Sequence, residues 1–155
     1  MKDIHLMNKN LKRSSKTMFK YRFKNESELY KFVGLTNFRL FSLFHRNNLN
    51  WIDVSNITDM HELFSNTNYE VDISKWDVSN VKDMTLMFCG SRIDCDLSGW
   101  DVSNVEKMQA MFAFSEFNHD VSMWDVSNVT DVKSWRQLFG DTESISYMTY
   151  NRKMP

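Results

Sequence analysis

The residues best suited to carry chemistry are aspartates that recur every 24 positions, each followed by Val-Ser-Asn. They are Asp53, Asp77, Asp101 and Asp125. If stacked strands carry them, the carboxylates lie about 4.8 Å apart on one exposed face. Like charges at that distance repel unless a cation, a basic partner or backbone donors compensate them. We interpret the column as a turn motif in which each Asp accepts from the Ser and Asn that follow it. The competing interpretation is a surface for a basic partner.

Other residues that could hold a metal or catalyse a reaction lack the spacing that they need. A metal site would add Asp72, Asp96 and Asp120 to the column, but the glycine-rich loops of calcium-binding β-helices are missing. The four histidines share no zinc spacing, and Cys89 and Cys95 form no standard metal motif. No glycine-rich phosphate loop or G-x-S-x-G elbow occurs. We therefore expect no enzymatic activity, no cofactor and no metal.

The aspartates belong to a repeat of 24 residues, and this repeat must position them. Its first part, residues 73–78, has the L-x-x-L-x-L spacing of a leucine-rich-repeat strand, with Trp76 and Val78 inside. Its second part, residues 81–88, follows i, i+3 spacing and predicts a helix of about two turns, capped by Ser79 or Asn80. One such unit cannot bury its apolar side alone, so neighbouring units must stack.

Positions that are identical in every copy are needed by the repeat itself. We expect the tryptophan and methionine columns to stack in a core rather than to form a cofactor site. The asparagine column is expected to cap turns. These columns are Trp76, Trp100 and Trp124, Met84 and Met108, and Asn56, Asn80, Asn104 and Asn128.

The pattern predicts an α/β fold: a leucine-rich-repeat-like solenoid of about four strand–turn–helix coils, with an α-helical N-terminal cap and a C-terminal closing strand. Within the cap we expect helices at 26–33 and 37–46, separated by Gly34. The expected parts are a basic, disordered tail at 1–18, the helical cap at 19–48, four repeats at 49–140 and a C-terminal cap at 141–155.

The run from Asp96 to Val105, followed by Met108 and by Met111-Phe112, resembles the repeat of the BspA-like leucine-rich-repeat proteins. The resemblance covers about residues 48–136. It implies a right-handed solenoid that binds other proteins and has no catalytic residues. The family includes bacterial surface proteins and adhesins, but Met1 to Arg13 contains no apolar stretch, so we expect neither a signal peptide nor an anchor here. Short, unanchored copies resemble those of bacteriophages and mobile elements, which implies a binder in the cytoplasm.

The formal net charge of −1 hides two opposite halves. Residues 1–50 carry 11 Lys and Arg against 3 Asp and Glu, whereas residues 51–155 carry 8 against 17. In the basic half, Phe19, Tyr21 and Phe23 alternate with cations, a combination that can bind phosphates and stack on bases. These cations can equally pair with the acidic repeats or dock a partner. They are Lys12, Arg13, Lys16, Lys20, Arg22 and Lys24.

Positions that differ between copies are free to recognise a partner. With no apolar run of about 18 residues, we expect no membrane partner. We predict a non-enzymatic protein-interaction module, and, if the gene is of phage origin, a stoichiometric inhibitor that competes for a basic groove on a host protein. The alternatives are nucleic-acid binding through the basic N-terminal region and a self-associating surface protein. The candidate partner-binding residues are Asp53, Lys75, Asp77, Leu86, Asp101, Phe114, Met123 and Asp125.

Overall fold

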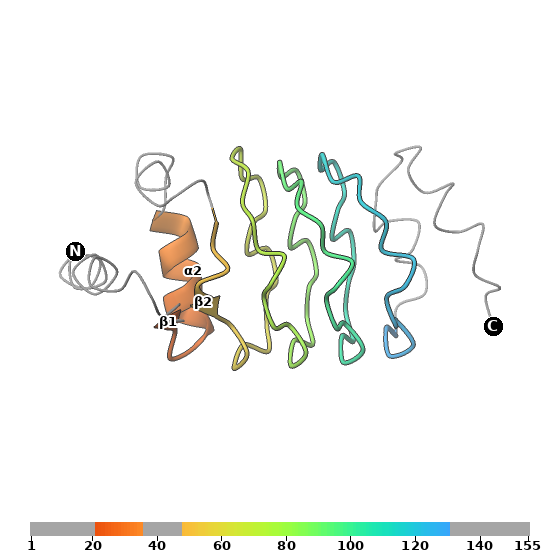
Figure 1. Ribbon diagram of the computed structural model, residues 1–155, viewed down its shortest axis with the longest axis horizontal. Helices are drawn as coiled ribbons and strands as arrows, with labels where there is room; N and C mark the ends of the chain where they lie inside the picture. The colour runs from red at the N-terminus through yellow and green to blue at the C-terminus, as the bar shows by residue number, and fades with distance from the viewer. Residues whose placement is uncertain (1–20, 36–47, 131–155) are drawn as a thin grey trace.

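The computed structural model describes residues 21–35 and 48–130, where its regular elements are two short strands and one helix. Strand β1 (Tyr21–Arg22) pairs in parallel with strand β2 (Ile52–Asp53), and helix α2 (Glu26–Leu35) lies between them in the chain. After β2 the chain runs through successive 24-residue segments, which we call coils, and these lie side by side in chain order (Figure 1). The predicted tail at 1–18, cap helix at 37–46 and C-terminal cap at 141–155 lie outside the described residues.

Helix α2 covers the N-terminal end of the stack. Asn25 Oδ1 accepts the N–H of Glu28 at 3.1 Å, and Glu28 Oε2 accepts the N–H of Lys24 at 3.0 Å, so two free helix-end donors are satisfied. The helix predicted at 26–33 is confirmed. The predicted break at Gly34 is wrong, because α2 continues to Leu35 and a single glycine costs a helix only about 1 kcal/mol. The side chains that the helix buries are Leu29, Phe32 and Val33.

The core consists of columns of identical side chains, as the sequence predicts. Phe88 stacks between Phe64 and Phe112, with ring centroids 5.8 and 5.4 Å apart. Each indole N–H of the tryptophan column donates to a carbonyl of the preceding coil, at 3.0 to 3.3 Å. The donors are Trp76, Trp100 and Trp124, and the acceptors are Leu49, Ile73 and Leu97. The columns therefore bury their apolar side chains, and the polar N–H of each buried indole has a hydrogen-bond acceptor.

The predicted two-turn helices of the repeats are wrong, because no helix occurs within residues 48–130. Over residues 84–90, every second N–H donates to a carbonyl of the next coil at 2.8 to 2.9 Å, as that of Phe88 does to Met111. Of the N–H groups in between, those of Met87 and Cys89 donate to the carbonyl three residues earlier, and that of Thr85 donates to Asp83 Oδ1 at 2.9 Å. Leu86 and Gly90 have φ values of 57° and 64°, which a right-handed helix excludes. A chain of short turns thus returns Met84 and Met87 to the core at helical spacing.

The first part of each coil is an extended run, and only β2 is a strand there within the described residues. The predicted alternation is confirmed, because Trp76 and Val78 are buried while Lys75 and Asp77 are exposed. The asparagine column was predicted to cap turns, but its side chains join neighbouring coils. Asn80 Nδ2, for example, donates to the carbonyl of Ser55 at 2.8 Å. The same bond recurs at Asn104 and Asn128, while Asn56 in the first coil donates to the carbonyl of Phe23.

Candidate interaction surface

The recurring aspartates each close a turn with the serine two residues later. Asp77 Oδ1 accepts the N–H of Ser79 at 3.2 Å and its hydroxyl at 2.6 Å, and Asp101 Oδ1 accepts from Ser103 at 3.1 and 2.7 Å. The prediction that these aspartates accept from the serines after them is confirmed, whereas the asparagine side chains donate to the preceding coil instead. Because Oδ1 receives these bonds, each carboxylate is held in one orientation. Asp53–Ser55 and Asp125–Ser127 complete the column.

A second column repeats the same turn five residues upstream. Its pairs are Asp72–Ser74, Asp96–Ser98 and Asp120–Ser122. The N–H and hydroxyl of Ser98 hold the pKa of Asp96 below its usual value, and Ser122 does the same for Asp120. These carboxylates are therefore ionised at neutral pH. From the sequence they were considered only as metal ligands, although the recurring Asp-x-Ser spacing marks them as turns. We call the surface formed by the two columns the aspartate face.

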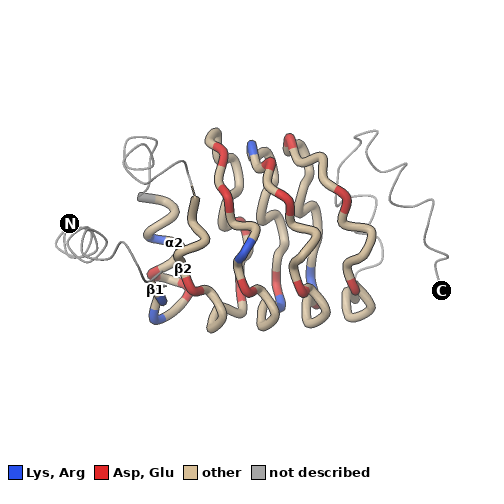
Figure 2. The backbone as a smooth tube through the Cα atoms, in the orientation of Figure 1, with Lys and Arg blue, Asp and Glu red and all other residues tan. Residues whose placement is uncertain are grey.

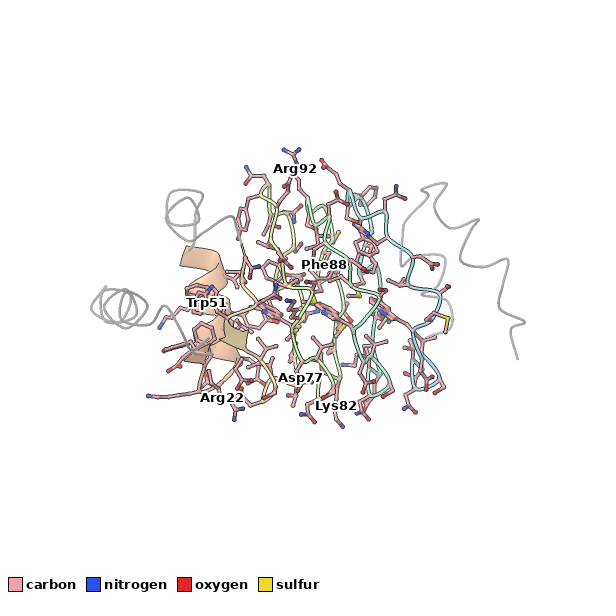
Figure 3. The ribbon with its side chains drawn as sticks, viewed as in Figure 1. Arg22, Trp51, Asp77, Lys82, Phe88 and Arg92 are labelled. Atoms are coloured by element: carbon pink, nitrogen blue, oxygen red, sulfur yellow. The ribbon has the colours of Figure 1, made fainter. Side chains whose placement is uncertain are left out.

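Three ion pairs elsewhere on the coils join residues of neighbouring coils, 24 residues apart. The pairs are Lys82–Glu106 at 3.1 Å, Lys107–Asp83 at 3.0 Å and Arg92–Glu116 at 3.2 Å. In Figure 3, Arg92 marks one edge of the stack and Lys82 the other, with Phe88 between them. Exposed pairs of this kind stabilise a protein by only about 0.2 to 1 kcal/mol. Each pair nevertheless brings one positive and one negative charge together, so neither carboxylate nor cation of these pairs is uncompensated.

At the N-terminal end of the aspartate face, cations compensate the carboxylates. Arg22 Nη2 lies 2.6 Å from Asp53 Oδ2. Partial burial raises the pKa of Asp53, but the hydrogen bonds from Ser55 and Arg22 outweigh it and leave that pKa below its usual value. Asp72 accepts Asn48 Nδ2 at 2.8 Å, and the charge of Lys75 acts on it from the same coil. The first part of the face is therefore nearly neutral.

Further along the stack this compensation is lost. Within residues 21–35 and 48–130, no ion pair joins Asp77, Asp101 or Asp120 to a cation. Figure 2 shows the acidic positions returning coil after coil. Where Lys75 stands in one coil, the next two have Gly99 and Met123. A Cβ at Gly99 would meet nothing within 4 Å, and Met123 is 86% exposed. The later coils thus combine unpaired negative charge with an exposed apolar side chain.

The two remaining candidates lie outside the aspartate face. Leu86 is half-buried in the run of short turns, and Phe114 follows that run in the next coil. Both have left-handed backbones, with φ values of 57° and 58°. Gly90 and Asn66, one and two repeats before Phe114, also have positive φ, at 64° and 55°. Phe114 is 80% exposed, so it is a separate exposed apolar site on the coils.

The basic N-terminal candidates divide into two groups. Arg22 is bound to Asp53 and Ser55, so in this chain it neutralises the carboxylate of the first coil. Lys24 is exposed, next to the start of α2. The others, Lys12, Arg13, Lys16 and Lys20, lie outside the described residues.

The described residues offer no group of three potential metal ligands. Cys89 and Cys95 are half-buried free thiols, and burial raises the pKa of Cys95 to about 11. A thiol with that pKa is a poor nucleophile at neutral pH. In the described part of the chain, no helix has the length and apolar character that crossing a membrane requires.

Comparison with known proteins identifies a family. The model of the family described as "Mycoplasma protein of unknown function, DUF285" matches residues 30–149, and the chain therefore belongs to this family. The match begins within helix α2, at Tyr30, and includes every described coil. No curated protein and no solved structure matches the chain.

Proposed function

We propose that this chain is a non-enzymatic protein-binding module, built as a right-handed leucine-rich-repeat-like solenoid of the BspA-like type. The stacking of 24-residue coils and their shared core support the architecture. The observation that carries the function is the difference between charged columns. Three cation–carboxylate pairs bridge neighbouring coils, whereas Asp77, Asp101 and Asp120 are oriented by their own serines and have no paired cation among the described residues.

Exposed apolar side chains support the same function. Monomeric proteins tolerate scattered apolar residues on their surfaces, but protein interfaces concentrate them beside polar and charged groups. Met123 adjoins the uncompensated part of the aspartate face. A partner with a basic surface would gain charge complementarity from the carboxylates and apolar contact from Met123. Nucleic acid is the weaker candidate, because its phosphates would be repelled by this face and Arg22 is already paired.

The test is capture of a partner by the full-length chain immobilised on resin, followed by titration of the purified partner. We expect one protein to bind at fixed stoichiometry, and the Met123→Ser variant to bind it several-fold more weakly. The matched control is Ser27→Ala, a conservative change at an exposed position of helix α2, outside the aspartate face. Recovery of nucleic acid alone, sensitive to salt, would instead favour the basic N-terminal region. Absence of any saturable protein partner would contradict the proposal.

A further inference from the structure

One carboxylate of the aspartate face already holds a guanidinium group. Arg22 Nε donates to Asp53 Oδ2 at 2.8 Å, and Arg22 Nη2 donates to the hydroxyl of Ser55 at 3.0 Å. Asp53 Oδ1 remains occupied by the N–H and hydroxyl of Ser55. One side of the guanidinium thus contacts both members of the Asp-x-Ser turn at once. The pairing of β1 with β2 brings Arg22 there.

The same turn recurs in the next two coils without a guanidinium. At Asp77 and Asp101, Oδ1 accepts from Ser79 and Ser103 at distances within 0.1 Å of those at Asp53. Oδ2 of these two aspartates accepts no hydrogen bond from the described residues. The carboxylate acceptor that takes Arg22 in the first coil is therefore repeated, oriented and open to solvent.

The position of Arg22 in the stack sets how an external guanidinium would approach. Arg22 reaches Asp53 from the preceding strand, whereas the corresponding neighbour of Asp77 is Asp53, and that of Asp101 is Asp77. A guanidinium from solvent would therefore lie between two successive carboxylates, which are about 4.8 Å apart. Its planar fork carries five N–H donors and can contact both carboxylates and a serine hydroxyl, which a lysine ammonium cannot match in geometry.

We propose that the aspartate face binds an extended, arginine-bearing segment of a partner protein, with guanidinium groups on the Asp77–Ser79 and Asp101–Ser103 turns. This inference rests on the proposed protein-binding function and specifies its partner. Gly99 leaves open space beside Asp101, and exposed Met123 offers an apolar surface to an arginine stem. A bound metal ion fits the face less well, because the described residues provide no group of three ligands.

The direct test titrates the full-length chain with a synthetic octapeptide of alternating Arg and Ser, at about 50 mM salt, where surface ion pairs are weakly screened. The same peptide with Lys in place of Arg is the chemical comparison. The double variant Asp77→Asn, Asp101→Asn keeps Oδ1 as an acceptor for the serines and removes two charges. The matched control is Glu62→Gln, Glu116→Gln, which removes the same charge from residues outside the two aspartate columns.

We expect the arginine peptide to bind the natural chain about fivefold to tenfold more tightly than the aspartate double variant, with the glutamate control within about twofold. The lysine peptide should bind at least about threefold more weakly than the arginine peptide. Equal affinity of the two peptides, or equal binding to the natural chain and the aspartate variant, would overturn the proposal. So would concentration-dependent self-association that the aspartate variant abolishes, because the face would then belong to a second copy.

Binding of the captured protein partner to the same variants tests the proposed function separately from the arginine site. If a captured protein partner binds the aspartate double variant as tightly as the natural chain, the arginine site is refuted and protein binding stands. If that partner loses affinity in the aspartate variant but not in the glutamate control, both proposals are supported. If no protein partner is captured while the arginine peptide still discriminates between the variants, the site is supported and the proposed function fails.

Discussion

Phe114→Asn should make this protein more stable, although it removes a large apolar side chain. Phe114 has a φ of 58°, in the left-handed region, where a bulky side chain is strained. It is also 80% exposed, so its ring gains little from burial. One repeat earlier stands Gly90 and two repeats earlier Asn66, the two residue types that adopt this conformation most easily.

The size of the effect follows from two opposing contributions. A left-handed backbone costs an ordinary residue about 1–2 kcal/mol, and asparagine avoids most of that cost. Full burial of a phenylalanine is worth roughly 1.5–3 kcal/mol, so the one-fifth of Phe114 that is buried contributes roughly 0.3–0.6 kcal/mol. The free energy of unfolding should therefore rise by roughly 0.5–1.5 kcal/mol, which is about 1–6 °C in Tm for a chain of this length.

The assay is urea unfolding followed by tryptophan fluorescence, with Tm from calorimetry as a second readout. Met123→Asn is the matched control, because Met123 is 86% exposed and is not among the residues with positive φ. Its free energy of unfolding should change by less than about 0.5 kcal/mol. If Phe114→Asn destabilises the chain, or has the same effect as the control, then the left-handed backbone at this position does not govern its stability.

Three further results are expected. Trp100→Phe deletes the indole donor to the carbonyl of Ile73 and should lower the free energy of unfolding by about 1–3 kcal/mol in urea titrations; an unchanged midpoint would contradict the role of this bond. Gly90→Ala places a Cβ 2.7 Å from Asn66 Oδ1 at a φ of 64°, so it should cost about 1–2 kcal/mol, and adding Asn66→Gly should recover only the steric part of that loss. Acid should destabilise the chain, because carboxylates whose pKa is lowered in the folded state contribute stability that is present above their unfolded pKa of about 4 and is lost as the pH falls through the folded value. Urea midpoints between pH 7 and pH 2 test this, and a rise in stability below pH 4 would contradict it; the carboxylates concerned are Glu26, Asp53, Asp72, Asp83, Asp96, Asp101 and Asp120.

The core was predictable because a fixed repeat length leaves little freedom in which side chains become neighbours. A 24-residue repeat without insertions places Trp76, Trp100 and Trp124 at equivalent points, and equivalent points in stacked coils become neighbours. The indole bonds to the preceding coil follow from the same register, but their carbonyl acceptors could not be named before the backbone was known.

The predicted helices failed because i, i+3 spacing does not distinguish a helix from a chain of short turns. Both return every third residue to the core. A discriminating signal was present in Asn66 and Gly90, which occupy one register position and both favour left-handed backbone. Leu86 and Ala110 share another left-handed position without such a residue type, so nothing in the sequence could reveal it there.

The aspartate face was partly predictable. The column beginning at Asp53 was recognised with its serine turns, whereas the pairing of Arg22 with Asp53 depends on β1 lying against β2, a contact between segments 31 residues apart that the repeat does not encode. The ion pairs between coils could have been predicted from the sequence. Lys82 and Glu106 have opposite charges and stand one 24-residue period apart, and stacking makes them neighbours.

Effects on stability and effects on partner binding should be separable in this protein, because different substitutions change the free energy of unfolding in opposite directions. Replacing a buried column residue such as Trp100 lowers stability, and any loss of binding would follow from unfolding. Replacing Phe114 raises stability, so a loss of binding there could not be attributed to the fold. Asp77→Asn and Asp101→Asn keep their serine turns and should change stability little. Weaker partner binding by a variant that is as stable as the natural chain, or more so, therefore identifies a contact with the partner rather than a defect of the stack.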